Sequence, residues 1–171
     1  MKQETKQQVA QTIANFRLPR YNEIPNVGLY LEQATKYVGE YLAPLGEYTL
    51  TPSMISNYVK KGLIANPVKK QYSRDHIAYL FFIAVAKSVL SLDALTGFIK
   101  VQQQSYTLPK AYDYFAEQIE SLLRFTFELD DTLEMVGEDT TLEKRLLYTC
   151  IVAAVQKVYL EKCLEAIAKE E

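Results

Sequence analysis

Apolar residues recur at three- and four-residue steps along most of the chain, which is the spacing of one face of an α-helix. The first clear case begins near Leu29 and ends where Ala43-Pro44 and Gly46 interrupt the pattern. Its apolar positions are Leu31, Ala34, Val38, Tyr41 and Leu42. No segment shows the sustained alternation of a half-buried strand, so the pattern predicts an all-α fold.

A short helix is predicted to begin at Thr51-Pro52, because threonine is a preferred N-cap and proline suits the first helical position. It should stop at Gly62, since glycine readily takes the left-handed conformation that ends many helices. Its apolar face consists of Met54, Ile55, Tyr58 and Val59, and we expect Tyr58 to belong to the core. Its polar face consists of Ser53, Ser56, Asn57, Lys60 and Lys61.

Residues 63–72 are too short and irregular for a helix and indicate a tight loop or a minimal β-ribbon. Ser73 then caps a helix over about residues 74–90. From Ile77 onward this helix is apolar on nearly every side, which is typical of the buried central element of a small domain.

Three further helices are predicted, over about residues 91–104, 109–129 and 141–169. Thr140 or Thr141 caps the last one, which would be about 40 Å long. Its apolar band is too wide for a narrow coiled-coil seam, so other helices or a second chain must cover it. We expect this helix or its neighbour to form the interface of a homodimer.

The composition of the 171-residue chain excludes several kinds of site. His76 is the only histidine, and with two cysteines it cannot complete a zinc site of four soft ligands. We expect His76 to be a surface or capping residue. Cys150 and Cys163 lie about 20 Å apart along one predicted helix, too far to form a disulfide with each other. We therefore expect free, mostly buried thiols, no metal, no cofactor and no catalytic residue.

The carboxylates and the aromatic cluster that follow residue 105 can be interpreted without a functional site. Glu117 and Glu120 lie at helical spacing without a metal-ligand partner and are interpreted as solvated. The cluster of Tyr106, Tyr112, Tyr114 and Phe115 could bind an apolar cation, although ordinary helix packing is the simpler interpretation.

The lengths of the apolar segments also indicate where in the cell the protein is found. The first residues lack the apolar core of a signal peptide, and the run Ala78–Ala86 is shorter than the ~20 residues that span a bilayer. We expect a cytoplasmic protein without membrane contact.

Charge is distributed unevenly although the net charge is only −2. Residues 1–110 contain 13 Lys and Arg against 7 Asp and Glu, whereas residues 111–171 contain 6 against 14. A basic front and an acidic back indicate that the front half faces a polyanion.

The basic residues of the front half concentrate in residues 49–83, where five cations accompany one acid, Asp75. The expected DNA-binding residues are Ser53, Ser56, Asn57, Lys60, Lys61, Lys69, Lys70 and Arg74. Lysines supply salt-dependent attraction to phosphates, while serine and asparagine can hydrogen-bond phosphates or base edges. A short exposed helix presented in this way is typical of helix-turn-helix proteins, whose second helix enters the major groove.

The stretch TPSMISNYVKKGLI…KKQYSRDHIAYLFFI resembles the winged-helix domain of MerR-type transcription regulators. Its matching residues are Tyr58, Gly62, Leu63, Ile64, Tyr72, Ser73, Asp75 and Ile77. The resemblance implies a winged helix-turn-helix-like part with a minimal wing. Where that family places arginines facing the DNA backbone, this chain has Ser53, Ser56 and Asn57.

Over a longer span, LPRYNEIP…GLYLEQ…TPSMISNYVKKGLI…PVKKQYSRDHIAYL is similar to the family called domain of unknown function 1836. We accordingly divide the chain into a polar N-terminal segment (1–20), a MerR-like helix-turn-helix domain (21–105) and a C-terminal dimerisation or effector region (106–171).

These observations predict a homodimeric transcriptional regulator that binds double-stranded DNA and is not an enzyme. The alternative is a helical protein-interaction module that retains the winged-helix scaffold. The sequence specifies neither a small-molecule effector nor an operator.

Overall fold

The computed structural model describes residues 2–137 and 140–170, and within them the chain is largely helical. Two 3-10 turns, Tyr21–Glu23 and Ala43–Leu45, precede and follow the second helix. The predicted all-α fold with a long last helix is confirmed. The α-helices are α1 (Gln3–Gln11), α2 (Leu31–Leu42), α3 (Pro52–Lys60), α4 (Arg74–Ala86), α5 (Leu92–Ser105), α6 (Leu108–Thr126) and α7 (Leu142–Ala168).

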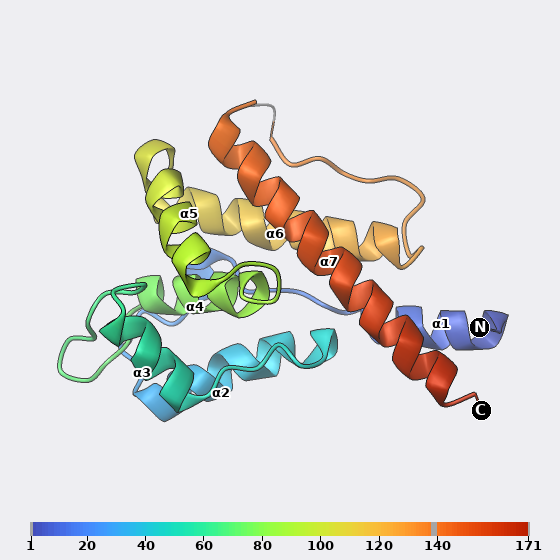
Figure 1. The fold of residues 1–171 in the computed structure, drawn as a ribbon, viewed down its shortest axis with the longest axis horizontal. Helices are drawn as coiled ribbons and strands as arrows, with labels where there is room; N and C mark the ends of the chain where they lie inside the picture. Colours follow the sequence, from blue (N-terminus) through green and yellow to red (C-terminus); the bar gives the residue numbers. More distant parts are fainter. Residues whose placement is uncertain (1, 138–139, 171) are drawn as a thin grey trace.

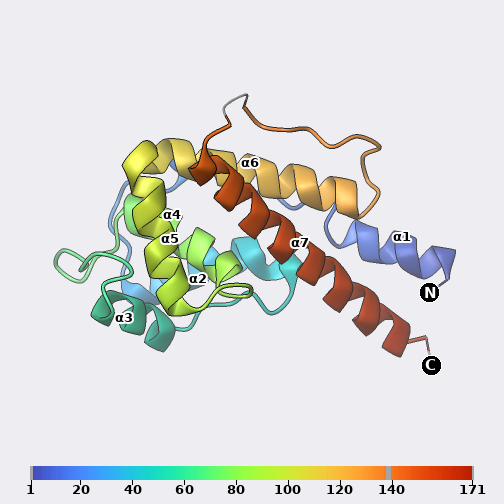
Figure 2. The same cartoon turned by 45° about the horizontal axis from the view of Figure 1, so that its top comes forward.

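Helix α4 occupies the middle of the molecule, as predicted for the most apolar helix (Figure 1). Nine of its thirteen residues are buried. Helix α2 packs against α4 on one side, and α6 and α7 pack against it on the other (Figure 2). The core is therefore formed by residues from both the N-terminal and the C-terminal parts of the sequence.

The helix starts follow the local rules that predicted them. The hydroxyls of Thr51, Ser91 and Thr141 each accept a hydrogen bond from the backbone N–H three residues further on, at 3.2 or 3.3 Å. Gly62 has a φ of 71° and ends α3 in the left-handed region, as expected.

Helix α4 ends at Ala86, earlier than the predicted residue 90. The backbone N–H groups of Ser88 and Val89 each donate to a carbonyl three residues back. The Ser88 hydroxyl also donates to the Val85 carbonyl at 2.7 Å. These short-range bonds close the helix in a tight turn.

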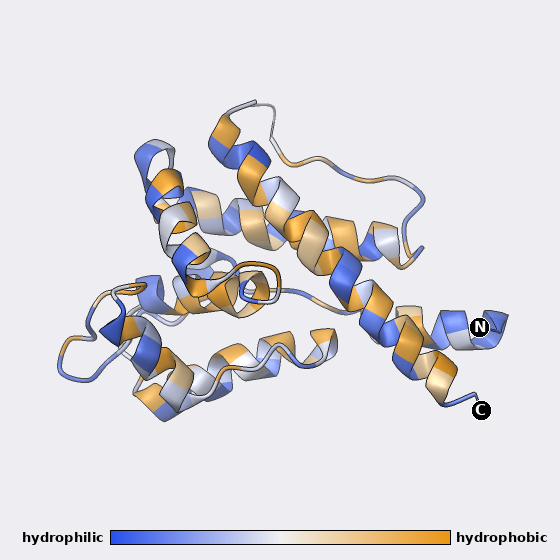
Figure 3. Ribbon diagram, in the orientation of Figure 1, coloured by the Kyte–Doolittle hydropathy of each residue, from blue (hydrophilic) through white to orange (hydrophobic). Residues whose placement is uncertain are grey.

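The N-terminal segment contributes more to the core than its polar composition predicts. Helix α1 is mostly hydrophilic (Figure 3), yet it packs against α7. Val9, Ile13 and Phe16 are buried. Their four- and three-residue spacing is the signal from which this burial could have been predicted.

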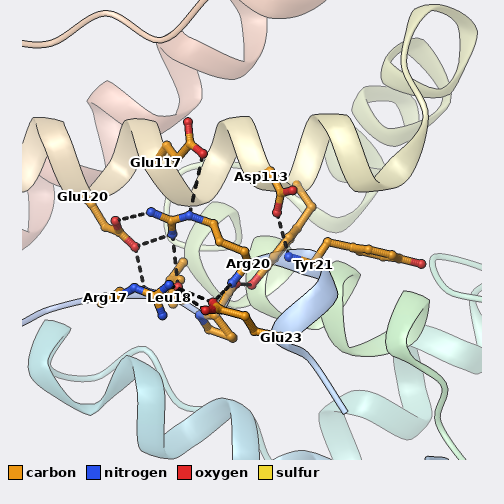
Figure 4. Close-up of polar contacts among 10 residues, drawn as sticks. Arg17, Leu18, Arg20, Tyr21, Glu23, Asp113, Glu117 and Glu120 are labelled. Carbon is orange, nitrogen blue, oxygen red and sulfur yellow. Dashed lines mark hydrogen bonds and ion pairs between the residues drawn. The ribbon is translucent and has the colours of Figure 1, made fainter. Parts of the chain in front are cut away.

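A network of hydrogen bonds fastens the segment before α2 to α6 (Figure 4). The Arg20 guanidinium donates to both carboxylate oxygens of Glu120, at 2.7 and 2.8 Å. The backbone N–H of Leu18 donates to the same carboxylate at 2.8 Å, and that of Tyr21 donates to Asp113 at 2.7 Å. The Glu120 side chain is only 15% exposed, so its interpretation as a solvated residue is wrong.

His76 joins the start of α4 to the loop before it. The Ser73 N–H donates to His76 Nδ1 at 3.0 Å, so Nδ1 is the acceptor and the ring proton lies on Nε2. Nε2 therefore donates to the Ala65 carbonyl, 3.1 Å away. The capping role is confirmed, but the surface position is wrong because His76 is buried.

Candidate nucleic-acid interface

Helix α3 presents a polar face to solvent. Ser53, Ser56 and Lys60 are exposed and Asn57 is half-buried, at positions that share one side of the helix. The opposite side is anchored in the core, since Ile55 and Tyr58 are buried. The prediction that Tyr58 belongs to the core is confirmed.

The chain after α3 reverses at Gly62 and becomes anchored again. Leu63 and Ile64 are buried, and the Leu63 N–H donates to the Tyr58 carbonyl at 2.9 Å. Lys61 precedes the reversal and is exposed. These two anchored residues hold the following loop beside the end of α3.

The loop folds back on itself in a two-residue turn formed by Lys69 and Lys70. The Gln71 N–H donates to the Val68 carbonyl at 2.9 Å. Both lysines have positive φ angles, 49° and 64°, as in the mirror-image turns that connect tight β-hairpins. Lysine rarely adopts this conformation, which strains an L-residue. The turn thus holds two consecutive exposed lysines on a strained backbone.

The base of this turn pairs with the segment before α2. Leu29 and Tyr72 exchange two backbone hydrogen bonds, of 3.0 and 2.7 Å. Gly28 lies so close to Gln71 that a Cβ on Gly28 would stand 2.6 Å from the Gln71 Cβ. These isolated pairings fulfil the sequence expectation of a tight loop or minimal ribbon.

Arg74 has partners inside the chain. Its Nε donates to the Ile24 carbonyl at 2.9 Å, and its guanidinium lies 5.4 Å from the centre of the Tyr21 ring. One guanidinium nitrogen also approaches the Asn22 carbonyl at 3.4 Å. The structure thus gives Arg74 a positioning role, because it ties the start of α4 to the segment at residues 21–24.

The polar face of α3 and the loop at residues 63–72 lie at the same end of the molecule. Figures 1 and 2 both place them opposite the two marked chain ends. Seven of the eight predicted residues therefore belong to two elements at one end of the molecule, and Arg74 is the first residue of α4. We call this region, formed by Ser53, Ser56, Asn57, Lys60, Lys61, Lys69 and Lys70, the α3 surface.

Three exposed apolar residues flank the α3 surface and were not predicted as part of it. Val68 is 72% exposed, Val27 is 70% exposed and Tyr30 is 54% exposed. Single apolar residues in loops follow no periodicity, so the sequence offered no signal for their exposure. They provide apolar contact area beside the lysine turn.

The described parts of the chain show no group of three or more His, Cys, Asp or Glu side chains arranged to hold a metal ion. Within those same ranges, none of the helices is both long and apolar enough to cross a membrane. Cys150 is buried, Cys163 is partly buried, and both are free thiols.

The chain belongs to the family described as domain of unknown function (DUF1836), whose model matches residues 19–115. The matched part includes α2, α3, the lysine turn, α4 and α5, and it ends within α6. No curated protein and no solved structure matches the chain.

Proposed function

We propose that the protein is a cytoplasmic, MerR-like DNA-binding transcriptional regulator whose α3 surface contacts double-stranded DNA. The observation that carries this proposal is the juxtaposition of the polar face of α3 with the lysine turn. Four exposed lysines lie in this region, and the acidic residues of the chain concentrate in its back half. A polyanion is the partner that matches such a surface.

The residues of the α3 surface divide into two kinds of contact. Lys60, Lys61, Lys69 and Lys70 are suited to phosphates, because an ammonium group attracts them regardless of sequence. Ser53, Ser56 and Asn57 are suited to base edges, and asparagine can pair with adenine through two hydrogen bonds. The strained lysine turn takes the part of a minimal wing beside the helix.

We propose that the regulator is a homodimer joined through α7. Figure 3 shows apolar residues along the whole of this helix, including parts not covered by other helices. Its exposed apolar side chains are Leu142, Leu146, Leu160, Leu164 and Ile167. Exposed apolar positions on one helix in this number favour a protein partner.

The spacing of these leucines favours an antiparallel pair centred on Ala153. Leu146 and Leu160 each lie seven residues from Ala153, and Leu142 and Leu164 each lie eleven residues from it. Both spacings are close to whole helical turns, so the four leucines share a face with exposed Ala153. Two antiparallel copies would therefore match leucine with leucine in a two-fold interface.

The proposed DNA binding is tested by titrating a fluorescent random duplex with the full chain at several salt concentrations. We expect the logarithm of affinity to fall with the logarithm of salt, with a slope of about 3–4 per protomer if all four lysines contact phosphates. A gel shift with DNA upstream of the protein's own coding sequence then tests sequence preference. Absence of duplex binding at low salt would contradict the proposal.

The alternative function is a helical protein-interaction module, and exposed Val27, Tyr30 and Val68 favour it. Such a module would bind its partner through apolar contacts with little dependence on salt. The salt titration therefore distinguishes the two functions.

A further inference from the structure

A cavity with two adjoining lobes lies between α4, α5, α6 and the start of α7, apart from the α3 surface. The inner lobe has a volume of about 50 Å³ and the outer lobe about 230 Å³. Gln102, Tyr106, Ala111 and Leu147 line both lobes, so we treat them as one site, the Gln102 pocket. An apolar cavity of about 150 Å³ is large enough to hold benzene. The outer lobe can therefore take a larger ring system.

The walls of the pocket are mainly apolar and aromatic. The inner lobe is walled by Phe82, Phe98 and Phe115, and the outer lobe by Tyr106 and Tyr114. Aromatic walls favour flat ligands, which they contact by stacking or edge-to-face packing. The small side chain of Ala111 belongs to the walls of both lobes.

Gln102 places one hydrogen-bond acceptor in these walls. Its Nε2 donates to the Glu143 carbonyl at 2.6 Å, which fixes the orientation of the amide. Its Oε1 is buried and has no donor among the described residues. Gln102 itself is only 9% exposed. A buried acceptor without a donor is costly, so a ligand that brings one N–H or O–H group gains a bond there.

The charged residues around the outer lobe balance one another. The ammonium of Lys110 lies 5.2 Å from the centre of the Tyr106 ring, and that of Lys144 lies 5.3 Å from the centre of the Tyr114 ring. Asp113 and Glu117 line the same lobe and supply two negative charges. Because cations of the chain already lie against these two rings and the net charge is zero, the lobe favours an uncharged ligand.

We propose that the Gln102 pocket binds an uncharged, flat one- or two-ring aromatic molecule that donates one hydrogen bond to Gln102 Oε1. The sequence interpretation of these aromatics as helix packing holds for Tyr112 and Phe115, which are buried. Tyr106 and Tyr114 line the outer lobe and contribute to the ligand site. This proposal does not depend on DNA binding.

The test uses the full chain and two probes, indole and benzothiophene. Both have the same two-ring shape, but only indole has an N–H donor. Binding is measured by two-dimensional amide NMR titration, which also locates the site. We expect saturable shifts around α5 and α6, and about fivefold tighter binding of indole than of benzothiophene, the gain of one hydrogen bond.

Two substitutions distinguish the contribution of the hydrogen bond to ligand binding from that of the pocket volume. Gln102→Leu keeps the size of the side chain but removes the acceptor, so we expect the preference for indole to disappear. Ala111→Phe fills the pocket and should abolish binding of both probes. Ala94→Leu, on the exposed side of α5, adds bulk outside the pocket and should leave both affinities unchanged.

The proposal is overturned if neither probe binds saturably up to millimolar concentrations, or if Ala111→Phe leaves binding unchanged. It is also overturned if indole and benzothiophene bind equally to the unmodified chain. Should Gln102→Leu not fold, the probe comparison and Ala111→Phe decide the outcome.

Discussion

Arg20 and Glu120 form a two-bond ion pair across one hundred residues of sequence, at 2.7 and 2.8 Å. The pair joins the segment before α2 to α6, and Glu120 also accepts the Leu18 N–H. Both side chains are largely covered, at 26% and 15% exposure, so water screens the pair only partly. Its partial burial makes it a contact of the core, unlike most ion pairs on protein surfaces.

Removing this contact should destabilise the fold. We expect Arg20→Ala to lower the free energy of unfolding by about 2 kcal/mol, because Glu120 then loses two charged hydrogen bonds. Arg17→Ala is the matched control, since Arg17 and Glu23 are about half exposed. It should cost less than about 1 kcal/mol. Urea unfolding of both variants measures the difference, and equal losses would contradict the prediction.

The positive φ angles of the lysine turn should lower the stability of the fold. Replacing Lys69 and Lys70 by Asn and Gly supplies residues suited to positive φ, so we expect a gain of about 1 kcal/mol in the free energy of unfolding. Replacing both by Ala removes the same charges but keeps the strain, so no gain is expected. Thermal unfolding compares the two double variants. A gain in both would show that charge repulsion, rather than backbone strain, is relieved.

DNA binding should respond differently to lysines and to Asn57. Lys69→Ala with Lys70→Ala should weaken binding to all duplexes alike and flatten the salt slope by about 1–2 units. Lys100→Ala with Lys169→Ala removes two exposed lysines outside the α3 surface and serves as the control. Asn57→Ala should instead change the preference among sequences. Negligible effects of both changes would favour the protein-interaction module.

The proposed α7 interface predicts that a charge placed in its seam changes the oligomeric state, whereas a charge placed elsewhere does not. Leu160→Glu places charge in the proposed seam and should give a monomer by light scattering at micromolar concentration. Met135→Glu is the control, because Met135 is equally exposed but lies outside α7. Leu146→Glu should have the same effect, because Leu146 of one copy faces Leu160 of the other in the proposed pair. A monomeric unmodified chain would refute the dimer.

The two thiols should differ in reactivity. Burial raises the pKa of the Cys150 thiol to about 11, because the charged thiolate loses its hydration. At pH 8 only about one Cys150 in a thousand would be thiolate. We expect a disulfide reagent to modify Cys163 quickly in the folded chain, and Cys150 only after unfolding. Fast modification of both thiols in the folded state would contradict this burial.

Short-range sequence signals predicted most of the helices and the polar face of α3. Caps such as Thr51 and the left-handed Gly62 act within one turn, so a single sequence contains the whole interaction. The remaining features depend on contacts between distant residues. The lysine turn rests on the pairing of Leu29 with Tyr72, and Arg74 is held by the segment at residues 21–24. No local pattern specifies such partners.

The match to the family ends at residue 115, inside α6, while the core continues past it. Ile119 and Leu122 on the rest of α6, and Ile151 on α7, are buried in the same core as α4. A relative that shared only the matched part would keep the packing of Tyr112 and Phe115 on α4 but would need another cover in place of α7. In such relatives the covering helices can diverge, or be exchanged, as long as α4 remains buried. The constant and variable parts of the family would then meet along α4.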